Sequence, residues 1–339
     1  MTSRGSVAEM ESEGRFLDAI DALMDANRDR HDPDLERELV RLRHEAFTYV
    51  DRVAPSHEVP IARERPSGDV PQTISAADLT SDVLRNGILT SGSLHVRSLV
   101  PAARVQSLVE GIDRALAAVE ARAERQDKDI GDPWYDPFCT HPSYPKIKNR
   151  ELGNRRKWVK VTGGVWAADS PRMLFELFDM LDEVGLRQVI SEYLGERPAL
   201  TVDKCTLRRV GIDTDTNWHQ DGAFLGSGIR TVNMWLALSH CGDDAPGLDI
   251  VPTRLDGIVE TGTEGAIFPW SVGPGVVDRV AADAPVVRPI FEPGDVLFFD
   301  DLFLHRTAID ASMTRARYAI ESWFFAPSAY PEQYVPLMV

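Results

Sequence analysis

The sequence predicts an α+β fold in which a β-sandwich or jelly roll carries helices on its outside. Two observations support this fold class. Amphipathic helical patterns dominate the chain before about residue 199, whereas short β-rich runs separated by Gly, Pro and Asp turns dominate after it. At 339 residues the chain is long enough to bury one large core with an appendage.

The N-terminal part predicts a helical extension that a linker joins to the main domain. Apolar residues recur at helical spacing over residues 7–27 and again over residues 34–53. The following segment carries four prolines between residues 54 and 72 and shows no periodicity. We therefore expect a helical hairpin over residues 1–53, a linker over 54–77 and the main domain over 78–339.

The elements of the main domain follow from local patterns. Residues 79–99 predict a short helix and then a strand, and an apolar stripe predicts a helix from Ala102 to Arg122. One more helix is expected over residues 170–195, where Ser170 can cap the N-terminus and Pro171 fits the first turn. The later strands are expected at residues 200–210, 230–239, 247–252, 284–291, 294–301 and 316–325.

Composition and charge exclude several classes of partner. The chain has 37 basic and 53 acidic side chains, and its net charge of −16 repels nucleic acid and anionic membranes. The N-terminus lacks the apolar region of a signal peptide, and no run of about 18 apolar residues is available to span a bilayer. The three cysteines form no CxxC pair, which suits a reducing compartment. These features predict a cytoplasmic protein without nucleic-acid or membrane partners, and they leave the oligomeric state open.

The stretch "WHQDG" places His219 and Asp221 two residues apart where a β-rich run gives way to a turn. On an extended backbone two such side chains project to the same side and can converge on one metal ion. His305 follows a strongly apolar strand and is the best candidate for a third ligand. Two histidines and one carboxylate form the facial triad of non-haem Fe(II) oxygenases. A lone HxD pair is a weak signal, so the prediction depends on the whole arrangement.

Two arginines follow the distal histidine in "TRARYAIESWFF", namely Arg315 and Arg317. Both belong to one face of the predicted strand, about 7 Å apart along it, so both can point inward. An arginine beside the open iron positions can hold the distal carboxylate of a 2-oxo acid in a bidentate pair. The residue pattern alone leaves both arginines as candidates.

Four segments together resemble a known family: "NWHQDGAFL", "VNMWLALSHCGDDAPGLDIVP", "FEPGDVLFFDDLFLHRTAIDAS" and "RARYAIESWFF". They are similar to the phytanoyl-CoA dioxygenase family of Fe(II)- and 2-oxoglutarate-dependent oxygenases, and the resemblance extends over residues 79–327. It implies a cupin-like, double-stranded β-helix core and the use of Fe(II), 2-oxoglutarate and O2. It also implies that His219, Asp221 and His305 hold the iron and that a downstream arginine holds 2-oxoglutarate.

The resemblance also assigns expected roles to neighbouring residues. Asp221 favours hydroxylation, since related halogenases carry a small residue in its place. The hydroxyl of Thr307 is expected to bind the cosubstrate carboxylate. The "RYAI" pattern selects Arg317 as the 2-oxoglutarate ligand, with Arg315 as the alternative. Arg208 either assists the cosubstrate or forms a surface salt bridge.

Further candidates lie on the predicted strands and in one basic segment. Asn233 and Trp235 share a strand face, so either can look into the barrel beside the metal. Trp218, Trp235 and Trp323 are candidate substrate contacts, with a place in the core as the alternative. Residues 145–160 hold seven Lys or Arg and one Glu, which predicts a solvated loop or, alternatively, a rim that attracts an anionic substrate.

The sequence therefore predicts an Fe(II)- and 2-oxoglutarate-dependent dioxygenase that hydroxylates a small molecule and releases succinate and CO2. Desaturation, epoxidation or ring formation would use the same metal ligands. One alternative is a jelly-roll binding protein without catalytic activity. Another is an iron oxygenase that uses no 2-oxo acid.

Overall fold

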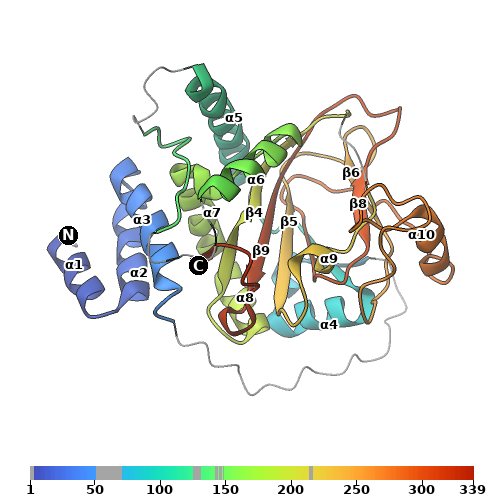
Figure 1. Cartoon of the computed structure of the whole chain (residues 1–339), viewed down its shortest axis with the longest axis horizontal. Helices are drawn as coiled ribbons and strands as arrows, with labels where there is room; N and C mark the ends of the chain where they lie inside the picture. Colours follow the sequence, from blue (N-terminus) through green and yellow to red (C-terminus); the bar gives the residue numbers. More distant parts are fainter. Residues whose placement is uncertain are drawn as a thin grey trace.

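Two antiparallel β-sheets face each other at the centre of the molecule (Figure 1). The computed structural model describes residues 4–50, 71–124, 131–141, 144, 147, 149–213 and 217–339. The helices α2, α3 and α7 lie on one side of the large sheet, and the small sheet lies on the other. This arrangement confirms the predicted α+β class with a double-stranded β-helix, or jelly-roll, core and flanking helices.

The large sheet has the strand order β1-β2-β7-β5-β9-β4-β10, and β3 pairs with β4. Neighbouring strands are antiparallel except for β1 and β2, which run parallel. The bounds of its strands are β1 Gln72–Ser75, β2 Ser93–Arg97, β3 Gly164–Trp166, β4 Ala199–Val210, β5 Thr231–Ala237, β7 Val296–Phe299, β9 Arg317–Phe325 and β10 Pro336–Met338. The central strands β5, β7 and β9 are almost wholly buried, as a sheet covered on both faces requires.

The small sheet pairs β6 (Gly247–Ile250) with β8 (His305–Ala308). Isolated antiparallel bridges widen it on both sides, from His219 to His305 and from Ile250 to Val287. The strand predicted over residues 284–291 does not form, and among these residues only Val287 and Phe291 make isolated bridges. Prolines at positions 285 and 289 explain the difference, because each lacks the N–H that a ladder needs.

Side chains alternate between the two faces of the large sheet. On β5, Met234 and Leu236 join the buried cluster formed with the helices, whereas Trp235 and Ala237 point into the space between the sheets. This period of two is the one expected for a strand buried on both faces. Inward-facing positions of β4, β5, β8 and β9 are therefore the ones that can line a site inside the barrel.

Three helices precede the sheet: α1 (Arg4–Ser12), α2 (Phe16–Asn27) and α3 (Pro33–Ala46). The single helix predicted over residues 7–27 is interrupted at Gly14, whose φ of 76° lies in the left-handed region that favours glycine. The second predicted helix, over residues 34–53, forms as α3 and begins as expected, where Asp32 accepts a hydrogen bond from the backbone N–H of Asp34, but it already ends at Ala46.

The N-terminal helices pack on the helical side of the large sheet. In α3, Arg43 donates to the carbonyl of Met338 at 2.8 Å, and His44 Nδ1 lies 3.0 Å from the carbonyl of Pro336. Most of the predicted linker, residues 54–70, lies outside the described residues, as do residues 51–53 of the predicted hairpin. Its last residues belong to the sheet instead, because Gln72–Ser75 pairs with β2.

The remaining helices surround the barrel: α4 Ser81–Ser91, α5 Ala102–Glu124, α6 Asn149–Val161, α7 Pro171–Glu183, α8 Leu186–Leu194, α9 Gly222–Leu225 and α10 Pro274–Val280. The helix predicted over residues 170–195 is divided into α7 and α8 at Gly185, with φ 71°. Pro171 stands in the first turn of α7 as expected, but the Ser170 hydroxyl makes no capping hydrogen bond. Among the described residues, no helix has the length and apolarity needed to cross a bilayer.

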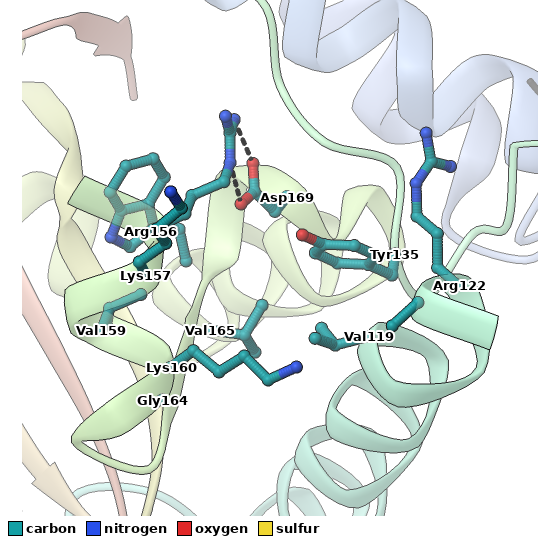
Figure 2. Close-up of a pocket in the computed structure, with 12 residues that line it drawn as sticks. Val119, Arg122, Tyr135, Arg156, Lys157, Val159, Lys160, Gly164, Val165 and Asp169 are labelled. Atoms are coloured by element: carbon teal, nitrogen blue, oxygen red, sulfur yellow. Dashed lines mark hydrogen bonds and ion pairs between the residues drawn. The ribbon is translucent and has the colours of Figure 1, made fainter. Parts of the chain in front are cut away.

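The basic segment 145–160 is wrongly predicted as a loop, because residues from Asn149 onward form α6. Its arginines are held by acidic partners. Arg156 contacts the buried carboxylate of Asp169 at 2.7 Å, as Figure 2 shows, and Arg155 contacts Asp203 at 2.6 Å. For each guanidinium, burial lowers the pKa and the acidic partner raises it. The net shift of both pKa values is upward. Both arginines are therefore held in ion pairs with buried carboxylates.

Acidification should weaken the packing of α3. Burial lowers the pKa of His44 below its ordinary value of 6.5, so the folded chain resists a proton that the unfolded chain accepts. Stability is therefore present above pH 6.5 and is lost as pH falls, at up to about 1.4 kcal/mol per pH unit for this group. Urea-unfolding midpoints between pH 7.5 and 5 should fall less steeply in His44→Gln than in the parent, and equal slopes would contradict this.

Candidate active site

Three possible metal ligands meet at the edge of the small sheet. The backbones of His219 and His305 form an antiparallel bridge. The N–H of His219 donates to the carbonyl of His305 at 3.0 Å, and the N–H of His305 donates to the carbonyl of His219 at 3.1 Å. Asp221 follows a turn and has helical backbone angles, φ −63° and ψ −27°, just before α9. The two ligands of the HxD motif thus converge through a strand-to-helix turn, and the predicted extended backbone is wrong at Asp221.

Donor atoms of His219, Asp221 and His305 all lie within 4.8 Å of one another. Nε2 of His305 is 3.6 Å from a carboxylate oxygen of Asp221, and the two imidazole rings are 4.4 Å apart between centroids. Spacings of this size are those of groups that surround one first-row metal ion. The structure therefore brings together the three residues that the sequence selected.

Backbone carbonyls orient the two imidazole rings. Nδ1 of His219 lies 2.8 Å from the carbonyl of Asn217, and Nδ1 of His305 lies 3.1 Å from the carbonyl of Phe303. A carbonyl only accepts hydrogen bonds, so each Nδ1 carries the proton and each Nε2 keeps its lone pair. This is the tautomer that a metal ligand requires.

Burial also determines the charges of this cluster. It lowers the pKa of His305 to about 3, with His219 adding to the shift, so the imidazole is neutral near pH 7. Burial raises the pKa of Asp221, and His219 opposes that shift. A buried carboxylate beside the neutral imidazole of His305 has no cation of its own in an ion pair among the described residues, and a divalent metal ion would supply the positive charge.

Gln220 fixes the turn between the two HxD ligands. Its side-chain amide donates to the carbonyls of Gly257 and Leu302, at 3.0 and 2.6 Å, and accepts from the N–H of Val259 at 2.7 Å. The residue is fully buried. It therefore ties the turn between His219 and Asp221 to two other loops, a role that the sequence analysis did not predict.

A cavity of about 640 Å³ opens beside the three ligands, inside the barrel. Arg317 lies in its wall and is only 1% exposed. Nη1 donates to the carbonyl of Gly247 at 2.9 Å, Nε has no hydrogen-bond partner in the described chain, and the guanidinium lies 5.2 Å from the ring centroid of Trp235. Within the described residues no carboxylate forms an ion pair with it. A buried cation of this kind requires an anionic ligand.

Other predicted residues line the same cavity. Asn233, Trp235, Thr307, Arg208 and Trp323 all contribute to its wall. The Asn233 Oδ1 and Trp235 Nε1 atoms are buried without a hydrogen-bond partner in the described chain, so both are available to a ligand. Arg208 forms an ion pair with Glu321 at 2.8 Å inside the cavity, which excludes the surface salt bridge considered for it.

Two predicted residues lie elsewhere. Arg315 precedes β9, its side chain is 63% exposed, and it pairs with Asp244 at 3.2 Å. The prediction that both arginines share one inward strand face is therefore wrong, because the strand begins only at Arg317. Trp218 packs in a separate buried cluster with Val272 and is not among the residues of the cavity wall.

Sequence reasoning missed several residues of the cavity wall. Lys204 and Glu321 both project into it. So do aromatic side chains from α6, α9 and the loop before α10, namely Trp158, Phe224, Phe268 and Trp270. Lys204 shares the inward face of β4 with Arg208, and Glu321 shares that of β9 with Arg317, so strand alternation was the signal that could have found them.

The chain matches a family model described as phytanoyl-CoA dioxygenase (PhyH) over residues 89–315. The chain belongs to this family. The match contains His219, Asp221 and His305, and stops just before Arg317. No curated protein matches the sequence significantly.

Members of the phytanoyl-CoA dioxygenase family use Fe(II), 2-oxoglutarate and O2, and these are the cofactor and cosubstrates of this chain. The cavity fits them on its own chemistry. A His-Asp-His donor set suits Fe(II), and a buried, unpaired guanidinium suits a dicarboxylate that reaches the metal.

Several solved structures are similar to this chain. EctD from S. alaskensis, solved with 2-oxoglutarate and 5-hydroxyectoine, is 16% identical, with 80% of this chain and 82% of that chain covered and a TM-score of 0.49. AviO1 from Streptomyces viridochromogenes Tue57 is 16% identical, with 75% and 98% covered and a TM-score of 0.45. EvdO2 from Micromonospora carbonacea var. aurantiaca, complexed with 2-oxoglutarate, is 14% identical, with 74% and 90% covered and a TM-score of 0.45.

Proposed function

We propose that this protein is an Fe(II)- and 2-oxoglutarate-dependent hydroxylase of a small molecule, with succinate and CO2 as coproducts. One observation carries the proposal: the His219, Asp221 and His305 donor atoms share a cavity with the buried and unpaired guanidinium of Arg317. Iron and 2-oxoglutarate together supply the O2-dependent oxidant that attacks a C–H bond of the substrate.

The protein residues have separate roles in this proposal. His219, Asp221 and His305 would hold the metal. Arg317 pairs with the distal carboxylate of 2-oxoglutarate, and the hydroxyl of Thr307 donates to the same group. Asn233 and Trp235 offer the unpaired Oδ1 and Nε1 atoms to ligands in the cavity. The aromatic wall excludes water from the reacting groups.

Hydroxylation is the outcome that Asp221 favours, because a carboxylate ligand occupies the position that a halide would need. The jelly-roll binding protein is the weaker alternative, since a binding module has no need of three metal-ligand side chains arranged around an open face. An iron oxygenase without a 2-oxo acid leaves the buried charge of Arg317 unexplained.

Anaerobic addition of Fe(II) and 2-oxoglutarate should produce a weak visible charge-transfer band if His219, Asp221 and His305 hold the iron and Arg317 holds 2-oxoglutarate beside it. Admission of O2 should then release succinate in an amount equal to the 2-oxoglutarate consumed. The measurement is anaerobic absorption spectroscopy followed by quantification of succinate.

Two controls separate the alternatives. The same titration with Zn(II) in place of Fe(II) should give no visible band, since Zn(II) has a filled d shell. A pure binding protein would give neither the band nor succinate. An iron oxygenase that uses no 2-oxo acid would oxidise its substrate without succinate release.

A further inference from the structure

We infer that the substrate of this cavity is a small anion with a flat, apolar body. Its charged group pairs with Lys204, and its body packs against Phe224 and Trp270. The inference rests on the proposed function, because it takes iron and 2-oxoglutarate to occupy the rest of the cavity. Two independent features carry it, the charge balance of the cavity wall and the arrangement of its aromatic rings.

The acidic side chains of the cavity wall already have partners. Asp203 pairs with Arg155 at 2.6 Å, and Glu321 pairs with Arg208 at 2.8 Å. Asp221 faces the histidines of the proposed metal site. None of these carboxylates is left over to neutralise another cation.

Lys204 is the cation that remains. Its Nζ forms no ion pair within the described residues and lies 4.0 Å from the ring centroid of Phe224. Fe²⁺ and the 2-oxoglutarate dianion cancel in charge, and so do Arg317 and Asp221. With Lys204 protonated, the loaded cavity therefore keeps one positive charge. Burial lowers the pKa of this ammonium, and nearby carboxylates oppose the shift, so an anion beside it would relieve the cost of burial.

Aromatic rings form the wall between Lys204 and the metal ligands. Phe268 and Trp270 stack with an interplanar angle of 6° and 5.1 Å between centroids. Trp270 lies 5.6 Å from Phe224 and 5.9 Å from the ring of His219. Such flat faces favour a planar or alicyclic body over a polar chain.

The positions of these groups limit the length of the substrate. The ring of Phe224 is contacted by Lys204 and lies 6.1 Å from the ring of His219. One aromatic ring thus separates the anion-binding ammonium from a metal ligand. The carbon that is oxidised should therefore lie only a few bonds from the anionic group, and the cavity of about 640 Å³ must also hold 2-oxoglutarate.

A matched pair of probes tests the inference: 2-naphthalenesulfonate and its uncharged sulfonamide. Both are titrated calorimetrically into the full chain, held anaerobically with Fe(II) and saturating 2-oxoglutarate. Lys204→Met should raise the Kd of the sulfonate at least about tenfold, the size expected from the loss of one charged partner, and change that of the sulfonamide less than about twofold. Trp270→Ala should weaken both probes.

Control variants distinguish the possible outcomes. Lys204→Arg should keep most of the preference for the sulfonate, and Lys157→Met, which removes a charge from α6 outside this cavity, should change neither Kd. An equal loss for both probes in Lys204→Met would overturn the inference, as would a loss of 2-oxoglutarate affinity in that variant. If 2-oxoglutarate fails to bind the parent chain, the proposed function fails instead. The comparison of the two probes still tests whether Lys204 binds an anion.

Discussion

His305→Ala should abolish turnover and weaken Fe(II) binding by more than about a hundredfold. Mutation of a residue that only hydrogen-bonds to a metal ligand already lowers metal affinity about ten- to a hundredfold. The side chain is buried, and its Nε2 faces the carboxylate of Asp221 at 3.6 Å. The Nδ1 contact with the Phe303 carbonyl is lost with the ring, but the backbone bridge to His219 remains. Equilibrium dialysis against Fe(II) and succinate release measure the two effects.

The fold of this variant should survive, because removal of one buried side chain typically costs about 1 to 3 kcal/mol. Circular dichroism and a melting curve check this point. His95→Ala is the matched control, since His95 is also buried but contacts Asp295 at 3.2 Å and is not part of the cavity wall. It should keep one Fe(II) per chain. Turnover that persists in His305→Ala would remove this residue from the metal site.

The meeting of the three candidate metal ligands was predictable because local sequence determines where each one lies. His219 and Asp221 are two residues apart, so a single turn is enough to bring them together. The apolar strand before His305 restricts where His305 can lie. The fold class was predictable for a similar reason, since strand periodicity and turn residues are local signals. What the sequence did not reveal is the backbone at Asp221, which takes a helical conformation at the start of α9.

Tertiary context explains the errors in the secondary structure. Gly14 and Gly185 each adopt a positive φ and divide a pattern that reads as one helix. Apolar periodicity continues across both breaks, because the helices on either side contribute to the same core. The start of β9 is another case. The backbone N–H groups of Thr314 and Arg315 donate to the carbonyl of Asp244, which holds this segment as a loop and moves Arg315 out of the barrel.

Lys204 illustrates a limit of residue-by-residue reasoning. In "LTVDKCTLRRV" it stands among charged residues of a strand that also carries Asp203 and Arg209, so composition gives no reason to select it. Its importance depends on the pairing of Arg155 with Asp203 and of Arg208 with Glu321, which are partners from other elements. A charge balance of this kind can be drawn up only when the cavity wall is known.

Arg317→Ala should raise the 2-oxoglutarate KM at least about tenfold, because loss of one partner of a buried charge pair typically costs about 2 to 5 kcal/mol. The guanidinium is 1% exposed and has a free Nε, whereas the Arg315 side chain is 63% exposed and already pairs with Asp244. Arg315→Ala is therefore the matched control and should leave the KM nearly unchanged.

Arg317→Lys separates charge from shape in this interaction. It keeps a cation but removes the planar fork that grips a carboxylate with two parallel hydrogen bonds, so its KM should lie between those of the parent and Arg317→Ala. Steady-state succinate release at varied 2-oxoglutarate gives all four constants, and anaerobic titration of the visible band gives the Kd independently of turnover. A larger effect in Arg315→Ala than in Arg317→Ala would transfer the role to Arg315. An unchanged KM in every variant would remove the buried guanidinium from cosubstrate binding, and the free Nε would then need a different anionic partner.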